Sequence, residues 1–308
     1  MRAQLALLIG LVRHWSDIQR CDLVVAHGGL LWMALLAARL GFGKRPYVVF
    51  DVMTIMSELH RHSPQAGIGQ CSNACKARRS IWRLLEEWSS RLADLTIVCG
   101  PDDLPRFKQA PAMVVPHGVA ADPYVEDQSE DPALIGFLGG GRIAPNRAAV
   151  EFLSTAVLPA PDFGSVSCRV VGDRIGYSTV HPRLVYYGFT EVAHEGLAPV
   201  SVVCAPMVET GGVSTKVLVS LLCGKRTVCT PEAARGIERP PIGLWVSELA
   251  DFANSVATAL NTPWSAAESG VVRDSVLRAH GPDAIAQAWL VLLTAKQPSL
   301  SKKWRRSY

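Results

Sequence analysis

Residues 134–153 read LIGFLGGGRIAPNRAAVEFL, in which an apolar run passes into three consecutive glycines and then into a segment with helical periodicity. The apolar run is typical of a strand buried on both faces of a parallel sheet. Gly139, Gly140 and Gly141 permit a tight turn and a close approach of the backbone to a ligand. A helix is expected to start at Pro145 or at the residue after it, and its free N–H groups and positive dipole end attract an anion.

Two basic residues, Arg142 and Arg147, follow the same glycines and add positive charge near the predicted turn. Together these features predict a cradle for a diphosphate. The stretch is not a Walker loop, since no Gly-Lys-Ser/Thr follows, and it lacks the GxGxxG fingerprint. A strand–glycine–helix turn on its own is as often structural as ligand-binding, so both interpretations stay open at this point.

A second turn of the same kind lies in residues 205–238, APMVETGGVSTKVLVSLLCGKRTVCTPEAARGIE. A strand ends at Pro206, a loop follows, and a helix with a basic residue in its first turn ends at Gly224. Two such turns in one α/β domain would flank a crevice at the carboxyl ends of the strands. This duplication favours a ligand site over an ordinary αβ unit. The residues expected there are Glu209, Gly211, Gly212, Ser214 or Thr215 as the helix cap, and Lys216.

Strand and helix patterns alternate along most of the chain, which predicts a doubly wound α/β architecture. Continuous apolar runs predict strands at residues 22–27, 47–52, 95–100, 134–140, 168–173, 200–206 and 226–230. Helical periodicity predicts helices over 78–93, 147–157 and 214–223. In the first of these, one stripe holds the apolar residues Ile81, Leu84, Leu85, Trp88 and Leu92.

A polar, acidic segment at 121–132 lacks an apolar period and predicts a linker between two domains. We expect an N-terminal domain over 1–125 and a C-terminal domain over 131–308, the latter ending in a helix and the basic tail 301–308. This tail is interpreted as a solvated terminus, with a membrane-surface anchor as the alternative. The apolar stretches at 1–15 and 30–43 are too short to span a bilayer, so no transmembrane helix is predicted.

The composition limits the classes to which this protein can belong. Of 308 residues, 49% are hydrophobic and 19% charged, which is typical of a globular chain. A net charge of +4 is too small to indicate nucleic-acid binding, but it suits an anionic small ligand or a weak contact with a membrane surface. The eight cysteines are scattered, mostly in apolar runs, and indicate a reducing cytoplasm. The spacing of His60, His62, Cys71 and Cys75 matches no common zinc site, so no metal is expected.

The order of these landmarks resembles glycosyltransferase family 4, the group-1 enzymes of the GT-B fold, and within it the exopolysaccharide-type members. The resemblance covers about two thirds of the chain, and its specificity lies in the ordered set of motifs. The N-terminal half contributes CDLVVAHGG, YVVFDVMTIMSE, RLLEEWSSRLADLTIVCGPDDL and MVVPHGV. The C-terminal half contributes FLGGGRIAPNRAAVEFL, CRVVGD, VYYGFTE and the second glycine turn with its helix.

The resemblance implies two Rossmann-like domains facing a cleft, the first without its opening strand, and a retaining transfer of a sugar from a nucleoside diphosphate to a hydroxyl acceptor. It implies that Arg142 and Arg147 hold the diphosphate and neutralise the leaving group. Backbone N–H groups of the second turn would bind the same phosphates, and Asp51 would face the donor sugar. Neither a metal nor another cofactor is implied. The setting would be the cytoplasm or the inner membrane face.

The chain departs from the family where many members carry two glutamates eight residues apart. Gly211 and Val219 occupy those places, and Glu209 is the candidate substitute for the first. One alternative is therefore a catalytically silent GT-B protein that binds a nucleotide sugar or a protein partner. Another is a nucleotide-sugar epimerase, which needs acid–base carboxylates in the cleft. His27 has two equal interpretations, a residue facing the cleft or a structural histidine.

Overall fold

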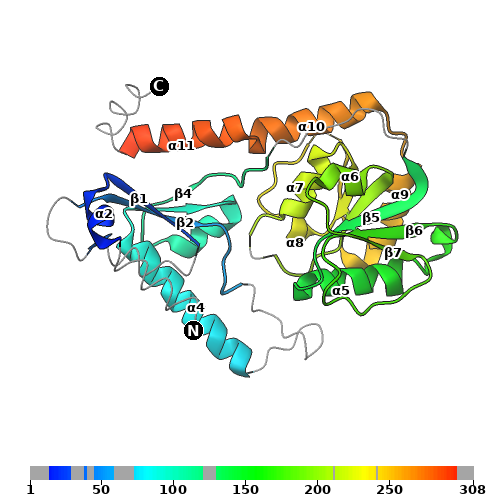
Figure 1. Cartoon of the computed structure of the whole chain (residues 1–308), viewed down its shortest axis with the longest axis horizontal. Coiled ribbons are helices and arrows are strands. Elements are labelled where there is room, and N and C mark those ends of the chain that lie inside the picture. The colour runs from blue at the N-terminus through cyan, green and yellow to red at the C-terminus, as the bar shows by residue number, and fades with distance from the viewer. Residues whose placement is uncertain are drawn as a thin grey trace. The chain divides into compact units, whose positions relative to one another are not determined.

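The computed structural model describes residues 14–28, 38–39, 45–58, 73–120, 130–210, 212–240 and 242–296. By internal contacts the chain forms two compact units, one of Met1–His117 with Ala286–Tyr308 and the other of Gly118–Ile285. These bounds differ from the expected domains 1–125 and 131–308, because the chain from Ala286 onward groups with the N-terminal unit. Figure 1 shows the two units with their elements labelled.

The N-terminal unit is built on a parallel sheet in the order β1-β2-β3-β4. Its elements are α2 (Trp15–Arg20), β1 (Leu23–His27), β2 (Tyr47–Val52), α4 (Asn73–Leu92), β3 (Leu95–Val98), the 3₁₀ helix η1 (Pro101–Phe107) and β4 (Ala112–Val114). The central strands are apolar and buried, as a sheet covered on both faces requires. The predicted strands at 22–27, 47–52 and 95–100 are therefore confirmed.

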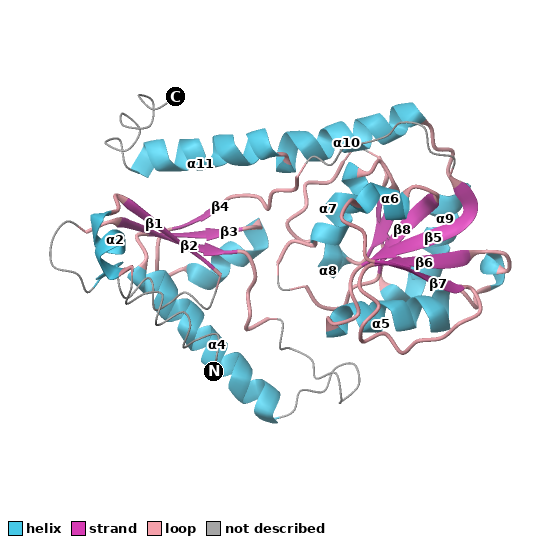
Figure 2. Ribbon diagram, in the orientation of Figure 1, coloured by secondary structure: helices cyan, strands magenta, loops and turns pink. Residues whose placement is uncertain are grey.

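The second unit is built on a six-stranded sheet whose order is β10-β9-β8-β5-β6-β7, and all of its pairings are parallel. Figure 2 shows helices around this sheet. The strands are β5 (Asp131–Leu138), β6 (Ser167–Val171), β7 (Leu184–Gly188), β8 (Val200–Ala205), β9 (Arg226–Cys229) and β10 (Leu244–Val246). The helices are α5 (Ala144–Phe152), η2 (Leu153–Val157), η3 (Pro161–Phe163), α6 (Ala193–Leu197), α7 (Thr215–Leu222), α8 (Pro231–Ala234), η4 (Leu249–Asp251), α9 (Phe252–Asn261) and α10 (Ala266–His280). The last helix, α11 (Pro282–Lys296), starts in this unit and belongs to the N-terminal unit from Ala286 onward.

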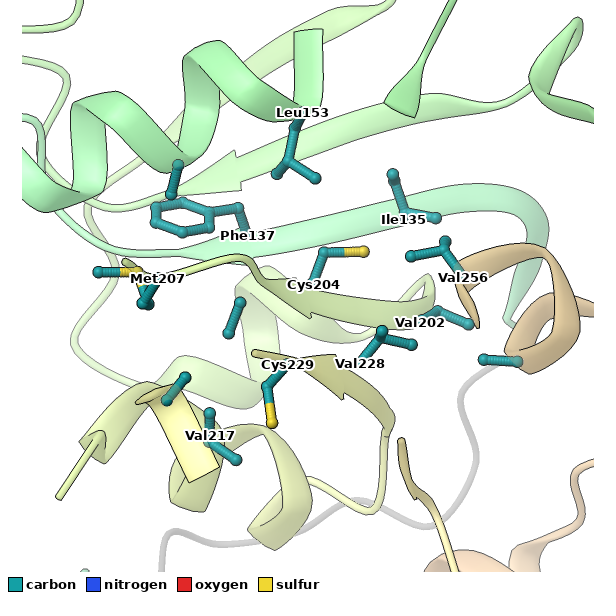
Figure 3. Close-up of a cluster of buried hydrophobic side chains, with 14 of the residues drawn as sticks. Ile135, Phe137, Leu153, Val202, Cys204, Met207, Val217, Val228, Cys229 and Val256 are labelled. Carbon is teal, nitrogen blue, oxygen red and sulfur yellow. The ribbon is translucent and has the colours of Figure 1, made fainter. Parts of the chain in front are cut away.

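Alternate residues of β5 belong to two different hydrophobic clusters, so this sheet is buried on both faces. Ile135 and Phe137 lie in the larger cluster, which includes residues of α5, α7 and α9 (Figure 3). Leu134 lies in the smaller cluster, which includes Leu197 of α6 and Cys223 at the end of α7. Burial on both faces explains why the strand reads as an unbroken apolar run.

Two expectations differ from the structure in detail. Asp131 already opens β5, so the end of the expected linker 121–132 belongs to the sheet. The helix expected over 78–93 begins earlier, at Asn73, and its apolar stripe is not the buried face: Ile81, Leu84 and Trp88 are all exposed. Leu85 and Leu92 of the same stripe are half-buried, and Leu92 packs against the core of the unit, whereas the fully buried residues of α4 include the polar Glu86, Ser89 and Ser90.

Several expectations fall on residues outside the described ranges. These are the N-terminal apolar run, most of the segment 30–43, the residues His60, His62 and Cys71, and the tail 301–308. Among the described residues, no helix combines the length and the hydrophobicity needed to cross a bilayer. Cys99, Cys168, Cys204 and Cys229 are free and buried, as their apolar surroundings predict, and Cys223 is buried as well.

Candidate functional site

The second unit has a topological switch point between β5 and β8. These strands are neighbours and parallel, and the chain runs from β5 outward through β6 and β7 on one side, then returns to β8 and continues through β9 and β10 on the other. The connections after β5 and β8 therefore depart in opposite directions. In open α/β sheets a crevice forms at the carboxyl ends of such a strand pair and binds ligands. Both glycine turns predicted from the sequence follow this pair of strands.

The first turn, residues 139–143, is packed against the segment that follows β6. The Gly139 N–H donates to the Val171 carbonyl at 2.8 Å, and the Gly141 N–H donates to the Asp173 carbonyl at 2.8 Å. The Tyr177 hydroxyl donates to the Gly139 carbonyl at 2.8 Å, and burial raises the pKa of this phenol. These contacts tie the backbone of the loop to the segment after β6.

The helix after this turn begins at Ala144, one residue before the expected start, with Pro145 in its first turn. The buried amide of Asn146 donates to the Gly140 carbonyl at 2.9 Å and thereby ties the helix to the glycines. Arg147 donates to the Gly141 carbonyl at 2.8 Å through Nη1. Part of the Arg147 guanidinium therefore supports the loop.

Gly140 and Gly141 differ in the space around them, and this difference predicts opposite responses to substitution. A Cβ on Gly141 would lie 2.5 Å from Tyr177 Cδ2 and 2.8 Å from the Tyr177 backbone nitrogen. Gly141→Ala is expected to lower the free energy of unfolding by about 2 kcal/mol. A Cβ on Gly140 would meet nothing closer than 3.6 Å, so Gly140→Ala is expected to stay within about 0.5 kcal/mol of the wild type.

Folding thus does not require glycine at position 140. A phosphate that approaches the backbone there would require it, because a side chain would occupy the space. We expect Gly140→Ala to weaken nucleoside diphosphate binding by about tenfold or more, which is 1.4 kcal/mol. Urea unfolding and a binding titration measure the two effects separately. Unchanged affinity in the Gly140→Ala variant would remove the backbone of residue 140 from the site.

Arg142 extends from the same turn into solvent, with 67% of its side chain exposed. Its Nε donates to Asp173 Oδ2 at 2.7 Å. This hydrogen bond, together with one from the Ile175 N–H, lowers the pKa of the Asp173 carboxyl. The pair orients the guanidinium beside the glycines while most of it stays accessible, which suits a group that contacts an anionic ligand.

The second turn, residues 206–214, is held by the segment that follows β9. The Thr230 hydroxyl donates to the Met207 carbonyl at 2.5 Å, and the Thr210 hydroxyl donates to the Glu232 carbonyl at 3.0 Å. Glu209 and Gly212 in this turn are half-buried, and Gly211 lies outside the described residues. The turn leads directly into α7.

Ser214, and not Thr215, is the N-terminal cap residue of α7. Ser214 is 6% exposed, and its hydroxyl makes no hydrogen bond to any described residue. Thr215 is exposed at the first position of the helix. The N-terminus of α7 therefore presents a buried hydroxyl and free backbone N–H groups at the switch point.

Lys216, which is half-buried, links α7 to the strand before the first turn. It lies in the first turn of α7, and its Nζ is 5.8 Å from the centroid of the Phe137 ring. Phe137 lies on β5, two residues before Gly139. Burial lowers the pKa of its ammonium to about 8. No described carboxylate forms an ion pair with it. A buried cation without an anionic partner is costly, and an anionic ligand would supply that partner.

The N-terminal unit carries its own pair of polar residues. His27 is the last residue of β1, Asp51 is the last but one of the adjacent parallel strand β2, and the two are in register. His27 Nδ1 lies 2.7 Å from Asp51 Oδ2. Asp51 thus lies near the carboxyl end of β2, and its partner is His27, for which the sequence left two interpretations open.

Val219 lies on α7 one turn beyond Lys216 and packs against both hydrophobic clusters of the second unit. The surroundings of the Val219 side chain are therefore apolar. The residues that sequence reasoning did not assign to the site are Asp173, Tyr177, Asn146, Thr230 and Glu232. The signal for Asp173 was available, because it follows an apolar strand in the run CRVVGD. The sequence around Tyr177 and Glu232 gave no such signal, since these residues reach the turns through tertiary contacts.

No protein-family model matches the sequence, and no curated protein sequence matches it significantly. Solved structures do match its fold. HepE from Anabaena, in complex with UDP and glucose, superposes with a TM-score of 0.67 and 15% identity over 92% of this chain and 80% of HepE. Sucrose-phosphate synthase from Thermosynechococcus elongatus matches with a TM-score of 0.66 and 16% identity over 89% of this chain and 74% of that enzyme.

The α,α-trehalose 6-phosphate synthase from Burkholderia multivorans gives a TM-score of 0.64 and 13% identity over 94% of this chain and 74% of that protein. Identities this low establish the fold alone. The chain therefore has the two-domain, Rossmann-like fold of the GT-B glycosyltransferases.

Proposed function

We propose that this protein transfers a sugar from a nucleoside diphosphate to a hydroxyl acceptor, with the diphosphate bound at the β5–β8 switch point. The observation that carries the proposal is Lys216, a half-buried residue whose ammonium lies 5.8 Å from the Phe137 ring and forms no ion pair with a described carboxylate. The neighbours agree in chemistry, since HepE is described in complex with UDP-glucose. The nucleotide sugar is a substrate, and the proposal includes no metal and no other cofactor.

Each residue of the two turns has a proposed task. The backbone of Gly140, the N–H groups of Gly211 and Gly212 and the N-terminus of α7 with Ser214 and Thr215 would bind phosphate oxygens. Arg142, Arg147 and Lys216 would neutralise the negative charge that grows on the leaving diphosphate as the glycosidic bond breaks. Gly141 keeps the first turn closed.

The sugar and the acceptor belong to the finer part of the proposal. We propose that Asp51, oriented by His27, takes part in sugar transfer, and that Glu209 replaces the glutamate expected at position 211. Retention of the anomeric configuration rests on the resemblance to glycosyltransferase family 4. Acceptors in surface polysaccharide, glycolipid or small-molecule glycosylation fit this class. The free buried thiols favour the cytoplasm as the compartment.

A second candidate function is a silent GT-B protein that binds a nucleotide sugar without turning it over. Val219 favours it, because an apolar residue stands where many members of the family carry a glutamate and packs into the core. The two functions share the donor site and differ only in chemistry.

A thermal-shift panel of nucleoside diphosphates and their sugars tests the donor site, because a ligand that binds the folded state raises the melting temperature. The proposal expects a shift with at least one nucleotide, followed by sugar transfer when acceptors are supplied. A shift without transfer to any acceptor would support the silent protein. No shift with any nucleotide would contradict both.

Arg142→Ala tests the charge at the first turn. Removing an exposed side chain and its surface pair with Asp173 is expected to change the free energy of unfolding by less than about 1 kcal/mol. We expect the affinity for the diphosphate to fall about tenfold or more, since a charge-assisted contact is lost. Arg278→Ala, an exposed arginine on α10, is the control. Equal affinity in both variants would take Arg142 out of the site.

A further inference from the structure

The helix α4 exposes most of its apolar stripe, while Leu92 at its end packs against the core of the unit. Ile81, Leu84 and Trp88 follow one another at spacings of three and four residues, so they form one stripe, and they are 59%, 58% and 63% exposed. The opposite face carries Glu86, which is 2% exposed, together with buried serines. A surface helix normally turns its apolar stripe inward.

The polar face of α4 is fixed in place by hydrogen bonds. Glu86 accepts from the Ser57 N–H at 3.1 Å and from the Ser57 hydroxyl at 2.6 Å, and it pairs with Arg106 at 3.4 Å. One turn later, the Ser90 and Thr96 hydroxyls lie 2.9 Å apart. Rotating the apolar stripe inward would break these bonds and bury the stripe's basic neighbours. Its exposure is therefore built into the unit.

Basic residues outnumber acidic ones on α4. The five basic residues of the helix are Lys76, Arg78, Arg79, Arg83 and Arg91. The carboxylate of Glu86 is buried, and that of Glu87 pairs with Arg83 at 3.1 Å. Arg78 precedes Ile81 by three residues and Arg91 follows Trp88 by three, so both border the stripe along the helix.

We propose that this face of α4, the stripe of Ile81, Leu84 and Trp88 with its basic border, binds the surface of a bilayer that contains anionic lipids. An apolar stripe between basic side chains is the pattern of a helix that lies in the plane of the lipid headgroups. Tryptophan favours that interface, and Lys and Arg are attracted by the negative surface potential. A second copy of the chain fits less well, because it would bring two basic faces together. The inference does not depend on the sugar-transfer proposal.

Sedimentation of the full chain with vesicles tests the proposal. We expect binding to vesicles of equimolar phosphatidylcholine and phosphatidylglycerol, weaker binding to phosphatidylcholine alone, and release by salt. The triple variant Ile81→Ser, Leu84→Ser, Trp88→Ser is expected to lower the partition coefficient about a hundredfold, since each apolar side chain withdrawn from water contributes up to about tenfold. A triple variant of similarly exposed residues on α10 and α11, Val271→Ser, Leu290→Ser, Val291→Ser, is expected to bind like the wild type.

A second variant keeps the apolar stripe and tests the charge. Arg78→Gln with Arg91→Gln is expected to weaken binding to the anionic vesicles roughly twentyfold, at about fivefold for each residue, and to leave binding to phosphatidylcholine unchanged. It serves as the test if the serine variant does not fold by circular dichroism. Absence of wild-type binding to either vesicle overturns the proposal. So does a dimer in light scattering that the serine variant dissociates, since the face would then join two copies.

Discussion

Lys216→Met is expected to make the ligand-free protein more stable and at the same time to abolish most of its affinity for a nucleoside diphosphate. Methionine retains the apolar length of the side chain, so the packing against Phe137 survives. Loss of a buried charge that pairs with a phosphate weakens binding by about a hundredfold or more. Removal of the unbalanced ammonium should raise the free energy of unfolding by about 2 kcal/mol at pH 7.

The effect on stability has a defined pH dependence. Burial lowers the pKa of Lys216 from 10.5 in the unfolded chain to about 8 in the folded one. Below about pH 8 both states are protonated and the wild type carries the full penalty. Between the two pKa values only the unfolded state binds the proton, so wild-type stability rises with pH. The advantage of the methionine variant is therefore complete at pH 7 and disappears above about pH 10.5.

Urea unfolding at several pH values and calorimetric titration with a nucleoside diphosphate measure the two effects. Lys108→Met, the same change at an exposed lysine of the N-terminal unit, is the matched control and is expected to alter neither. Wild-type affinity should also decline as the pH rises through about 8, where the ammonium loses its proton. If the methionine variant binds the diphosphate as tightly as the wild type, the amine lies outside the donor site.

Glu86→Ala is expected to destabilise the N-terminal unit by about 3 kcal/mol, because one buried carboxylate satisfies several groups at once. It accepts two hydrogen bonds from Ser57, and it pairs with Arg106, which also pairs with Glu58 at 3.4 Å. Without it, the buried Ser57 donors lose their acceptor and Arg106 loses one of its two carboxylates. A loss of this size should lower the melting temperature by roughly 10 °C.

Glu87→Ala, one residue further along α4, is the control for that prediction. Glu87 forms a surface pair with Arg83, and such pairs contribute less than about 1 kcal/mol. Urea midpoints of the two variants, compared with the wild type, separate the buried network from general effects on the helix. Equal midpoints would mean that the Glu86 network adds nothing to stability. The same result would weaken the explanation given above for the outward orientation of the apolar stripe.

The elements that the sequence predicted correctly are those whose signal is local. The runs of β5 and β8 are apolar because these strands are covered on both faces, and Gly224 follows α7 with a φ of +69°. β7 and β10 did not stand out as apolar runs. They are edge strands, and their half-buried or exposed residues include polar and aromatic ones. An edge strand needs apolar side chains on fewer positions, so its sequence resembles that of a loop.

The orientation of α4 is a second feature that the sequence did not predict. Helical periodicity indicates that a helix has an apolar and a polar face, but it does not say which face is buried. That choice depends on Ser57 and Arg106, which lie 29 and 20 residues from Glu86 along the chain and meet it only in the folded unit. The contact of Tyr177 also depends on tertiary structure, because its hydroxyl donates to the carbonyl of Gly139, which lies 38 residues away in the sequence.

The sequence by itself determined the parallel α/β class, both glycine turns and the basic residues that follow them, because strand burial, turn formation and helix capping depend on neighbours within a few residues. Only the tertiary structure decided that the two turns meet at one switch point, that Lys216 lies over Phe137, and that Arg142 is oriented by Asp173. The physical reason is that strand order and the partners of charged side chains arise from contacts between distant segments, which no local pattern encodes.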